Sequence, residues 1–453
     1  MKKQHLQNSP IKAFISFLFL FICTLSTVNA QEKEGQWIEQ AALEVENMIL
    51  SEDMETIDQL IKKYADLQTM PVPEWKSHLL AIRKDMHNLD GDIGLSEDDE
   101  GLILSMSNPE RRRDLQIVLN QKDKKIAQLN LLQPSPEMSL SWNTLDDTFT
   151  QLEKEGMSGV IYIKKKDQII MQKAFGMADR QHNHKNRLET IFGTGSRPID
   201  YTVAAIQLLD QQGALRITDP ITKYISQVPE DKLKMTLHHL MTGQSGLPDF
   251  FDNDEDWDAD LAWVSRDEAV KRMMIQKLLF SPGEGRSHSH GAFGLLAAIV
   301  EIVSKDTYYS FIRKHFLDPA GMTRTGEYGE RRNLKVEDFA AGSGPQIIGF
   351  PNIPPNWGPT SWLIKGSGGM YSSLGDLLKF YDYVRSGKVL DESHRKSFER
   401  ATASVDGSMR GFELFSLYLP NKGELFLFSN EIGSQAKIRS LMRALEKLMT
   451  QEE

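Results

Sequence analysis

Residues 159–174, GVIYIKKKDQIIMQKA, contain two apolar runs separated by a short polar stretch. The runs Gly159–Lys164 and Gln168–Ala174 have the length and the β-branched content of strands, and the three polar residues between them form a turn. This stretch therefore predicts a β-hairpin. A pattern of helical periodicity at Trp142–Glu155 precedes it.

The carboxyl end of the chain predicts more strands and a closing helix. Gly411–Leu419 and Glu424–Ser429 are strand patterns joined by a short turn that contains proline and glycine, and Ile438–Leu448 is a helical pattern. A long helical region begins at Ser196, between the hairpin and these strands. We therefore expect residues 139–453 to form one domain of mixed helices and strands.

A smaller α+β domain is predicted at residues 31–135, before a boundary at Pro134 and Pro136. Its helical patterns are Trp37–Leu50, Met54–Tyr64 and Trp75–Met86, and its strand patterns are Gly101–Ser107, Asp114–Asn120 and Lys125–Leu132. Helices followed by a small antiparallel sheet are typical of an independent α+β domain. The segment carries no combination of residues that indicates catalysis.

The first 30 residues have the features of an export signal. Lysines precede Ala13–Cys23, an apolar run too short to span a bilayer, and the sequence VNA at 28–30 supplies small residues for cleavage after Ala30. Cleavage removes the only cysteine, and a chain without thiols suits an oxidising compartment. We expect a periplasmic or secreted protein, with an uncleaved anchor as the alternative.

Composition narrows the classes of function. The chain has 453 residues, 40% of them hydrophobic, with a net charge of -10 and a pI near 5.7. A soluble globular protein is expected, and the acidic balance argues against a nucleic-acid partner. The single cysteine excludes a disulfide framework and a zinc site built on cysteine pairs.

Six stretches between residues 173 and 390 resemble the serine β-lactamase and penicillin-binding-protein family, in particular its class C-related, esterase-like branch. In order they are KAFGMADRQHNHKNRLETIFGTGS (173–196), YTVAAIQLLDQQGALRITDPITKYI (201–225), LHHLMTGQSGLPDFF (237–251), FSPGEGRSHSHGAFGLLAAIVEIVS (280–304), LDPAGMTRT (317–325) and GSGGMYSSLGDLLKFYDYVRSGKVL (366–390). The resemblance implies an α+β fold in which an antiparallel sheet is flanked by helices beside a helical subdomain.

The first motif of that family is S-x-x-K, in which the lysine takes the proton of the serine nucleophile. The aligned residues here are Ser196, Arg197, Pro198 and Ile199. The serine is present at a predicted helix start, where backbone N–H groups favour a developing oxyanion. Ile199 stands where the lysine is expected and cannot move a proton, and Arg197 points to another face and stays charged. The general base of the family is therefore lost.

The second motif, Tyr-x-Asn in the family, aligns with His288, Ser289 and His290. A histidine works as a general base near neutral pH, so one hypothesis pairs Ser196 with His288 as a catalytic dyad. A second interpretation, which the sequence favours, is that both histidines arose under relaxed constraint, because no acidic partner for His288 is recognisable. A zinc site built on the two histidines is a third alternative, for which the sequence gives no third ligand.

The third motif, Lys- or His-Thr-Gly in the family, falls near Val405, Asp406 and Gly407, with a register uncertain by one or two positions. The basic first residue is missing, and a carboxylate at Asp406 is expected to repel a carboxylate substrate. Asp406 and Gly407 are the candidate substrate-binding residues, and their chemistry argues against recognition of a penicillin.

Losses in all three motifs favour an exported, catalytically degenerate family member that acts by binding a ligand or partner. The alternative is an active serine hydrolase, an esterase or a peptidase, that uses Ser196 with His288 and forms an acyl-enzyme. A structural component of the cell envelope is a third class. The sequence predicts no cofactor and no metal, and the expected partner is a small acyl compound or a cell-envelope ligand. It leaves the oligomeric state open.

Overall fold

The computed structural model describes residues 37–451 except for 39, 90–91, 99–100, 109–110, 121, 134–137, 252, 254–255, 257–261, 345 and 432–434. The predicted export signal lies outside these residues. The chain divides into two compact units, the first made chiefly of residues 1–134 and the second of residues 135–453. Within the described part of the chain, no helix combines the length and the apolar character needed to cross a membrane.

The first unit contains helices followed by a four-stranded antiparallel sheet. A helix within residues 37–50 precedes α2 (Glu55–Tyr64) and α3 (Val72–Met86), and the strands follow in the order β1 (Asp92–Asp98), β2 (Gly101–Ser107), β3 (Arg112–Asn120) and β4 (Lys125–Leu131). Strand β1 was not predicted, because its sequence DIGLSED is mostly polar. Leu79 of α3 packs in one core with Leu104 and Ile117 of the sheet, and this burial joins the helices to the strands.

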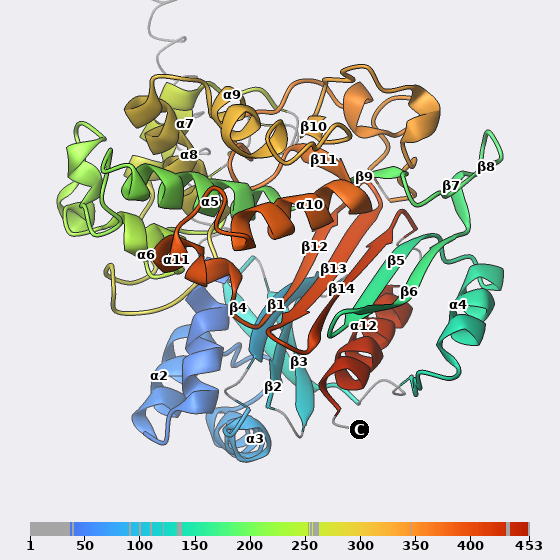
Figure 1. The fold of residues 1–453 in the computed structure, drawn as a ribbon. Helices are drawn as coiled ribbons and strands as arrows, with labels where there is room; N and C mark the ends of the chain where they lie inside the picture. The colour runs from blue at the N-terminus through green and yellow to red at the C-terminus, as the bar shows by residue number, and fades with distance from the viewer. Residues whose placement is uncertain are drawn as a thin grey trace, which may run out of the picture. The chain divides into compact units, whose positions relative to one another are not determined.

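The second unit is built on a five-stranded sheet in which every neighbouring pair is antiparallel (Figure 1). Across the sheet the order is β12 (Thr402–Ser408), β13 (Phe412–Leu419), β14 (Gly423–Ser429), β5 (Gly159–Lys165) and β6 (Gln168–Phe175). The predicted hairpin is β5 and β6, and the two predicted carboxyl-terminal strands are β13 and β14. Strand β12 lies at one edge of the sheet.

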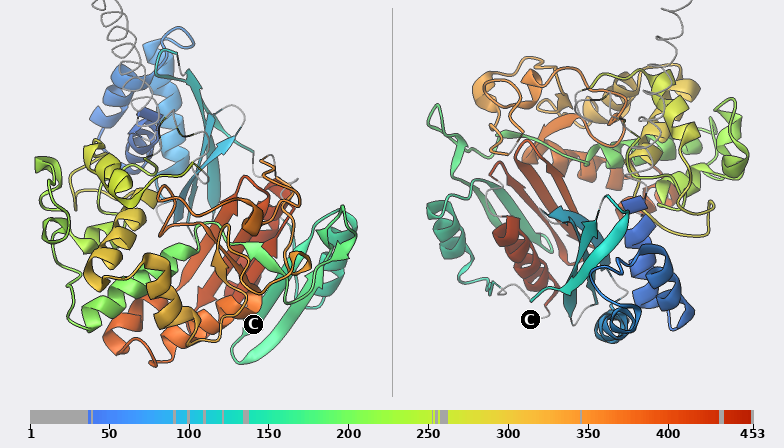
Figure 2. Two further views of the ribbon diagram at one scale, coloured as in Figure 1. Left: turned by 90° about the horizontal axis from the view of Figure 1, so that it is seen from above. Right: turned by 180° about the vertical axis from the view of Figure 1, so that it is seen from behind.

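The second unit also contains helices. They are α4 (Leu145–Lys154), α5 (Pro198–Gln211), α6 (Leu237–Met241), α7 (Arg266–Ile275), α8 (His290–Ser304), α9 (Tyr308–Ile312), α10 (Leu374–Arg385), α11 (Glu392–Arg395) and α12 (Gln435–Thr450). Figure 2 shows from two further sides that α5 to α9 gather beside the sheet as a helical part. This is the α+β arrangement that the resemblance implies.

Alternation along β5 explains why both faces of the sheet are covered. Successive side chains of a strand point to opposite faces. Val160 and Tyr162 belong to the core that includes residues of α5 and α8, whereas Ile161 and Ile163 belong to a separate core with residues of α4 and α12. A strand buried on both faces appears in sequence as a continuous apolar run, as Gly159–Ile163 does.

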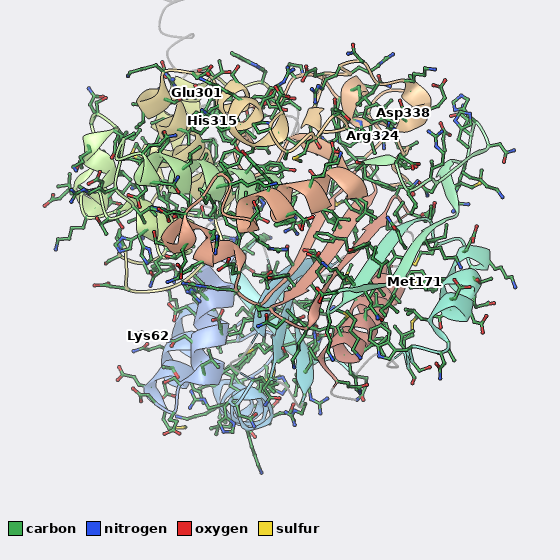
Figure 3. All side chains as sticks on the ribbon, in the orientation of Figure 1. Lys62, Met171, Glu301, His315, Arg324 and Asp338 are labelled. Atoms are coloured by element: carbon green, nitrogen blue, oxygen red, sulfur yellow. The ribbon has the colours of Figure 1, made fainter. Side chains whose placement is uncertain are left out.

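A smaller sheet positions the start of α5. It has the order β10 (Gly326–Glu327), β11 (Met370–Ser373) and β9 (Ile191–Gly193). Arg324 and Asp338, both labelled in Figure 3, form an ion pair of 2.7 Å, and Arg324 Nε also donates a hydrogen bond to the carbonyl of Glu189. These contacts hold the chain that leads into β9.

Candidate active site

Ser196 lies at the junction between β9 and α5. Thr194, directly after β9, donates hydrogen bonds from its N–H (3.2 Å) and its Oγ1 (2.9 Å) to the carbonyl of Met370 in β11. Helix α5 begins at Pro198, two residues after the serine, and proline suits this first position because its φ is preset for a helix. The serine thus sits just before the helix, close to where the sequence predicts it.

Gly195 brings the serine against the edge strand β12. Its φ is +52°, a left-handed conformation that glycine adopts without penalty. A Cβ added at this position would lie 2.8 Å from the backbone N of Gly407, closer than real contacts allow. Gly195 is therefore required both by its backbone conformation and by its close approach to β12.

Hydrogen bonds from the backbone and from the cap residue join residues 248–249 to the start of α8. Ser289, the N-cap of α8, accepts from Ala292 N–H at 3.0 Å and donates to the carbonyl of Pro248 at 2.7 Å. The backbone N–H of His290 donates to Asp249 Oδ1 at 2.9 Å, and Gly291 N–H donates to the Asp249 carbonyl at 3.0 Å. The cap thus fixes Asp249 beside His290, the first residue of the helix.

Ser196, His290 and Asp249 form a continuous hydrogen-bonded line. Ser196 Oγ lies 2.8 Å from His290 Nε2, and His290 Nδ1 lies 2.7 Å from Asp249 Oδ1. Burial raises the pKa of Asp249, but its hydrogen bonds and charge interaction with His290 outweigh this and lower the pKa below its ordinary value. The ionised carboxylate favours the proton on Nδ1, which leaves the lone pair of Nε2 facing the serine hydroxyl. This is the arrangement of a Ser-His-Asp triad.

Ser196 Oγ is hydrogen-bonded to His290 and not to His288, the histidine that the sequence hypothesis paired with it. The helix cap explains the difference, because Ser289 turns inward and His290 opens the helix, whereas His288 precedes the cap and is exposed. The His288 ring stands at 86° to the His290 ring, with centroids 4.7 Å apart. Loss of hydration and the neighbouring His290 lower the pKa of His288.

Asp249 is the site residue that the sequence analysis missed. It lies inside the stretch LHHLMTGQSGLPDFF, directly after the Ser-Gly-Leu-Pro segment. A separation of 41 residues from His290 gives no periodic signal. Its position directly after that family segment was the one available indication.

Phe250 stacks on the imidazole ring of His290. Its ring lies 4.5 Å from the His290 ring with an interplanar angle of 13°, which is a stacked geometry, and 42% of the residue is exposed. The imidazole is therefore restrained in its plane by stacking and in its rotation by Asp249.

Arg197, the residue after the serine, forms a buried ion pair with Asp406. The arginine also contacts polar groups on α5, α10, β12 and β13: Asp200 (3.0 Å), Tyr381 (3.0 Å), Ser404 (2.9 Å) and Ser416 (3.0 Å). Burial alone would lower the pKa of Arg197, but the negative charge of Asp406 raises it well above its ordinary value. The arginine stays charged, as the sequence predicts.

Asp406 does not present its charge to a substrate. Only 7% of the residue is exposed, and its carboxylate is paired with Arg197. The predicted repulsion of carboxylate substrates was therefore wrong in its physical basis, because the sequence did not reveal the neutralising partner. Gly407, the next residue, lies against Gly195 as described above.

Ile199 packs against the apolar core, and its side chain has no proton to give or accept. The backbone N–H groups of Arg197 and Ile199 are already used within the turn. Arg197 donates to the carbonyl of Thr194, and Ile199 donates to the carbonyl of Ser196, both at 3.1 Å. Pro198 has no N–H. The predicted contribution of helix N–H groups to an oxyanion site is therefore not available from these three residues.

An antiparallel sheet with helices on both faces, and a serine between a short strand and a buried helix, define the fold class of serine β-lactamases and penicillin-binding proteins. The Beta-lactamase family model matches residues 145–414. The chain belongs to this family.

The chain is similar to several known proteins. It is 26% identical over 316 residues to the putative penicillin-binding protein PbpX of Bacillus subtilis, a match that covers 66% of this chain and 77% of that protein. It is 25% identical over 307 residues to esterase EstB of Burkholderia gladioli, covering 59% of this chain and 76% of the esterase. The crystal structure of a penicillin-binding protein from Bacillus halodurans superimposes with a TM-score of 0.53 at 21% identity, covering 68% of this chain and all of that one, which supports the fold.

Proposed function

We propose that this protein is an active serine hydrolase that cleaves acyl esters through an acyl-enzyme on Ser196. The observation that carries the proposal is the 2.8 Å contact between Ser196 Oγ and His290 Nε2. The sequence favoured a degenerate binding protein because the family's lysine is replaced by Ile199. A histidine in hydrogen-bond contact with the nucleophile, itself bound to a carboxylate, supplies the missing base.

The reaction follows from the geometry. Ser196 Oγ attacks the carbonyl carbon of the ester while its proton passes to His290 Nε2. The tetrahedral intermediate collapses, the C–O bond to the leaving group breaks, and the leaving alkoxide takes the proton from Nε2. A water molecule then repeats the sequence on the acyl-enzyme and releases the acid. Asp249 stabilises the imidazolium that exists between the two proton transfers.

Two backbone elements are suited to bind the oxyanion. Among the described residues no acceptor takes a hydrogen bond from the N–H of Ser196. The edge strand β12 runs past the serine at Gly407, and an edge strand has N–H groups that no ladder uses. We assign the oxyanion to Ser196 N–H together with an N–H of β12 close to Gly407.

The side chains around Ser196 favour esters whose acyl group carries no charge. Phe250, Val405 and Met409 are exposed apolar side chains, at 42%, 60% and 55%, in the segments that carry the triad aspartate and the edge strand. Asp406 is neutralised by Arg197, so no unpaired charge of that pair is available to a substrate. The similarity to an esterase supports esters ahead of amides.

Labelling with a fluorophosphonate, followed by intact-mass measurement, tests the proposal. One adduct per chain is expected, and it should disappear in Ser196→Ala and in His290→Ala. Ser393→Ala is the matched control, because Ser393 Oγ also contacts a histidine (His394 Nδ1, 3.0 Å) but lies on the exposed helix α11. Absence of an adduct, together with no hydrolysis of short p-nitrophenyl esters, would favour the degenerate binding protein instead.

Export is part of the same proposal. The apolar run at 13–23 and the VNA sequence at 28–30 support a cleaved signal, and the rest of the chain contains no cysteine. Edman sequencing of the mature protein should begin at Gln31. A mature protein that still begins at Met1 would contradict cleavage.

A further inference from the structure

The triad histidine and aspartate belong to a second grouping that catalysis does not explain. Asp249, His288 and His290 each offer one ligand atom, and these three atoms lie within 4.8 Å of one another. In the described part of the chain this is the one trio of histidine and acidic residues that meets this distance. His288 is the member with no part in the hydrogen-bonded line, although its ring stands against that of His290.

These three side chains match the ligands of a zinc ion. Two imidazoles and one carboxylate, with a fourth position left to water, are a known zinc donor set, with metal–ligand distances of about 2.0–2.2 Å. Ligand atoms around a tetrahedral ion at that distance are about 3.4 Å apart. The present spacing, at most 4.8 Å, is therefore within about 1.4 Å of the spacing that the ion requires, and His288 is exposed to solvent.

We propose that Asp249, His288 and His290 bind one Zn²⁺ ion, and that this ion reversibly inhibits the hydrolase. The site itself stands on these residues alone, whereas the inhibition rests on the proposed function of Ser196. A neutral imidazole has one lone pair on its ring nitrogens. If zinc takes Nε2, that lone pair no longer faces Ser196. If zinc takes Nδ1, the single ring proton of the neutral imidazole moves from Nδ1 to Nε2, which then donates a hydrogen bond and cannot accept the serine proton. In both cases the serine loses its base.

Calorimetry on the full chain measures the site without reference to activity. ZnCl₂ titrated into wild-type protein and into Ser196→Ala should give one ion per chain in both. His288→Gln should weaken binding by at least about 100-fold, since even the loss of partners outside the ligand set costs about 10–100-fold. His184→Gln is the matched control: it also belongs to a His-x-His sequence beside an aspartate-bound histidine, His182, but its ring is 6.1 Å from that of His182.

Inhibition is measured as each variant's own rate with zinc divided by its rate with EDTA. This ratio should be about 0.1 or lower in wild type and in His184→Gln at a zinc concentration that saturates the wild-type site. In His288→Gln it should stay near one at the same concentration. Zinc binding that is unchanged in His288→Gln, or no zinc binding in wild type, would overturn the site. Zinc that raises the rate would overturn the inhibition.

The two proposals fail in different ways. A protein that hydrolyses esters but binds no zinc contradicts the metal site and leaves the hydrolase supported. A protein that binds one zinc through His288 but forms no adduct on Ser196 supports the metal site and contradicts the hydrolase together with its inhibition.

Discussion

Substitution of Asp249 by asparagine and by alanine should separate the two tasks of the carboxylate, which are to orient the imidazole and to stabilise its charge. Both hydrogen bonds from His290, from Nδ1 at 2.7 Å and from the backbone N–H at 2.9 Å, end on the same oxygen, Oδ1. An asparagine at 249 keeps a carbonyl oxygen at this position, so both donors retain their acceptor. Only the negative charge is lost.

The magnitude follows from that geometry. A hydrogen bond to a charged group contributes about 1.5–3 kcal/mol, and 1.36 kcal/mol corresponds to a tenfold change in rate. Asp249→Asn should therefore lower kcat by about 10–100-fold. Asp249→Ala removes the acceptor as well, so the tautomer and the rotation of the ring are no longer fixed, and the loss should reach about 10³–10⁴-fold.

Steady-state hydrolysis of p-nitrophenyl acetate provides the assay, with KM expected to change little in either variant. Asp179→Asn is the matched control, because Asp179 Oδ2 lies 2.7 Å from His182 Nδ1 in the same kind of pair but no serine contacts that histidine. A kcat of Asp249→Asn within threefold of wild type, or a loss as large as that of Asp249→Ala, would refute the reasoning.

Three further predictions concern the ion pair, the stacked ring and pH. Arg197→Met should lower the free energy of unfolding in urea by about 3–5 kcal/mol because it leaves Asp406 buried without its partner, and a double variant that also carries Asp406→Leu should lose less. Phe250→Ala should reduce kcat about 2–13-fold, since a stacked aromatic pair contributes about 0.5–1.5 kcal/mol. Its thermal stability should be unchanged because the ring is exposed. An increase in kcat, or no change, would show that stacking on His290 does not support the reaction. The lowered pKa of Asp249 means that the folded protein keeps this carboxylate ionised at pH values where the unfolded chain binds a proton. The stability advantage of wild type over Asp249→Asn should therefore be complete above about pH 5 and fade below about pH 4. Urea unfolding at pH 7 and pH 3 measures this advantage, and an advantage that grows toward pH 3 would contradict the lowered pKa.

Local patterns were sufficient for most of the fold. The β5–β6 hairpin, strands β13 and β14 and the helices of the first unit all have periodic apolar residues that mark burial within a few positions of the chain. Strand β1 was not predicted, since its polar sequence has no such pattern. The position of the serine at the start of a helix also follows from local sequence, because Pro198 suits the first helical turn.

The amino-acid sequence by itself determined the family, the candidate nucleophile Ser196 and the replacement of the family's lysine by Ile199. Only the tertiary structure decided which histidine meets that serine and which acid meets that histidine. The reason is physical: a proton relay depends on distances of 2.7–2.8 Å between groups separated by 94 and 41 residues. Such distances are set by how β9, the segment before Phe250 and the cap of α8 pack together. The periodicity of apolar residues within any one of these segments does not predict how the segments pack together.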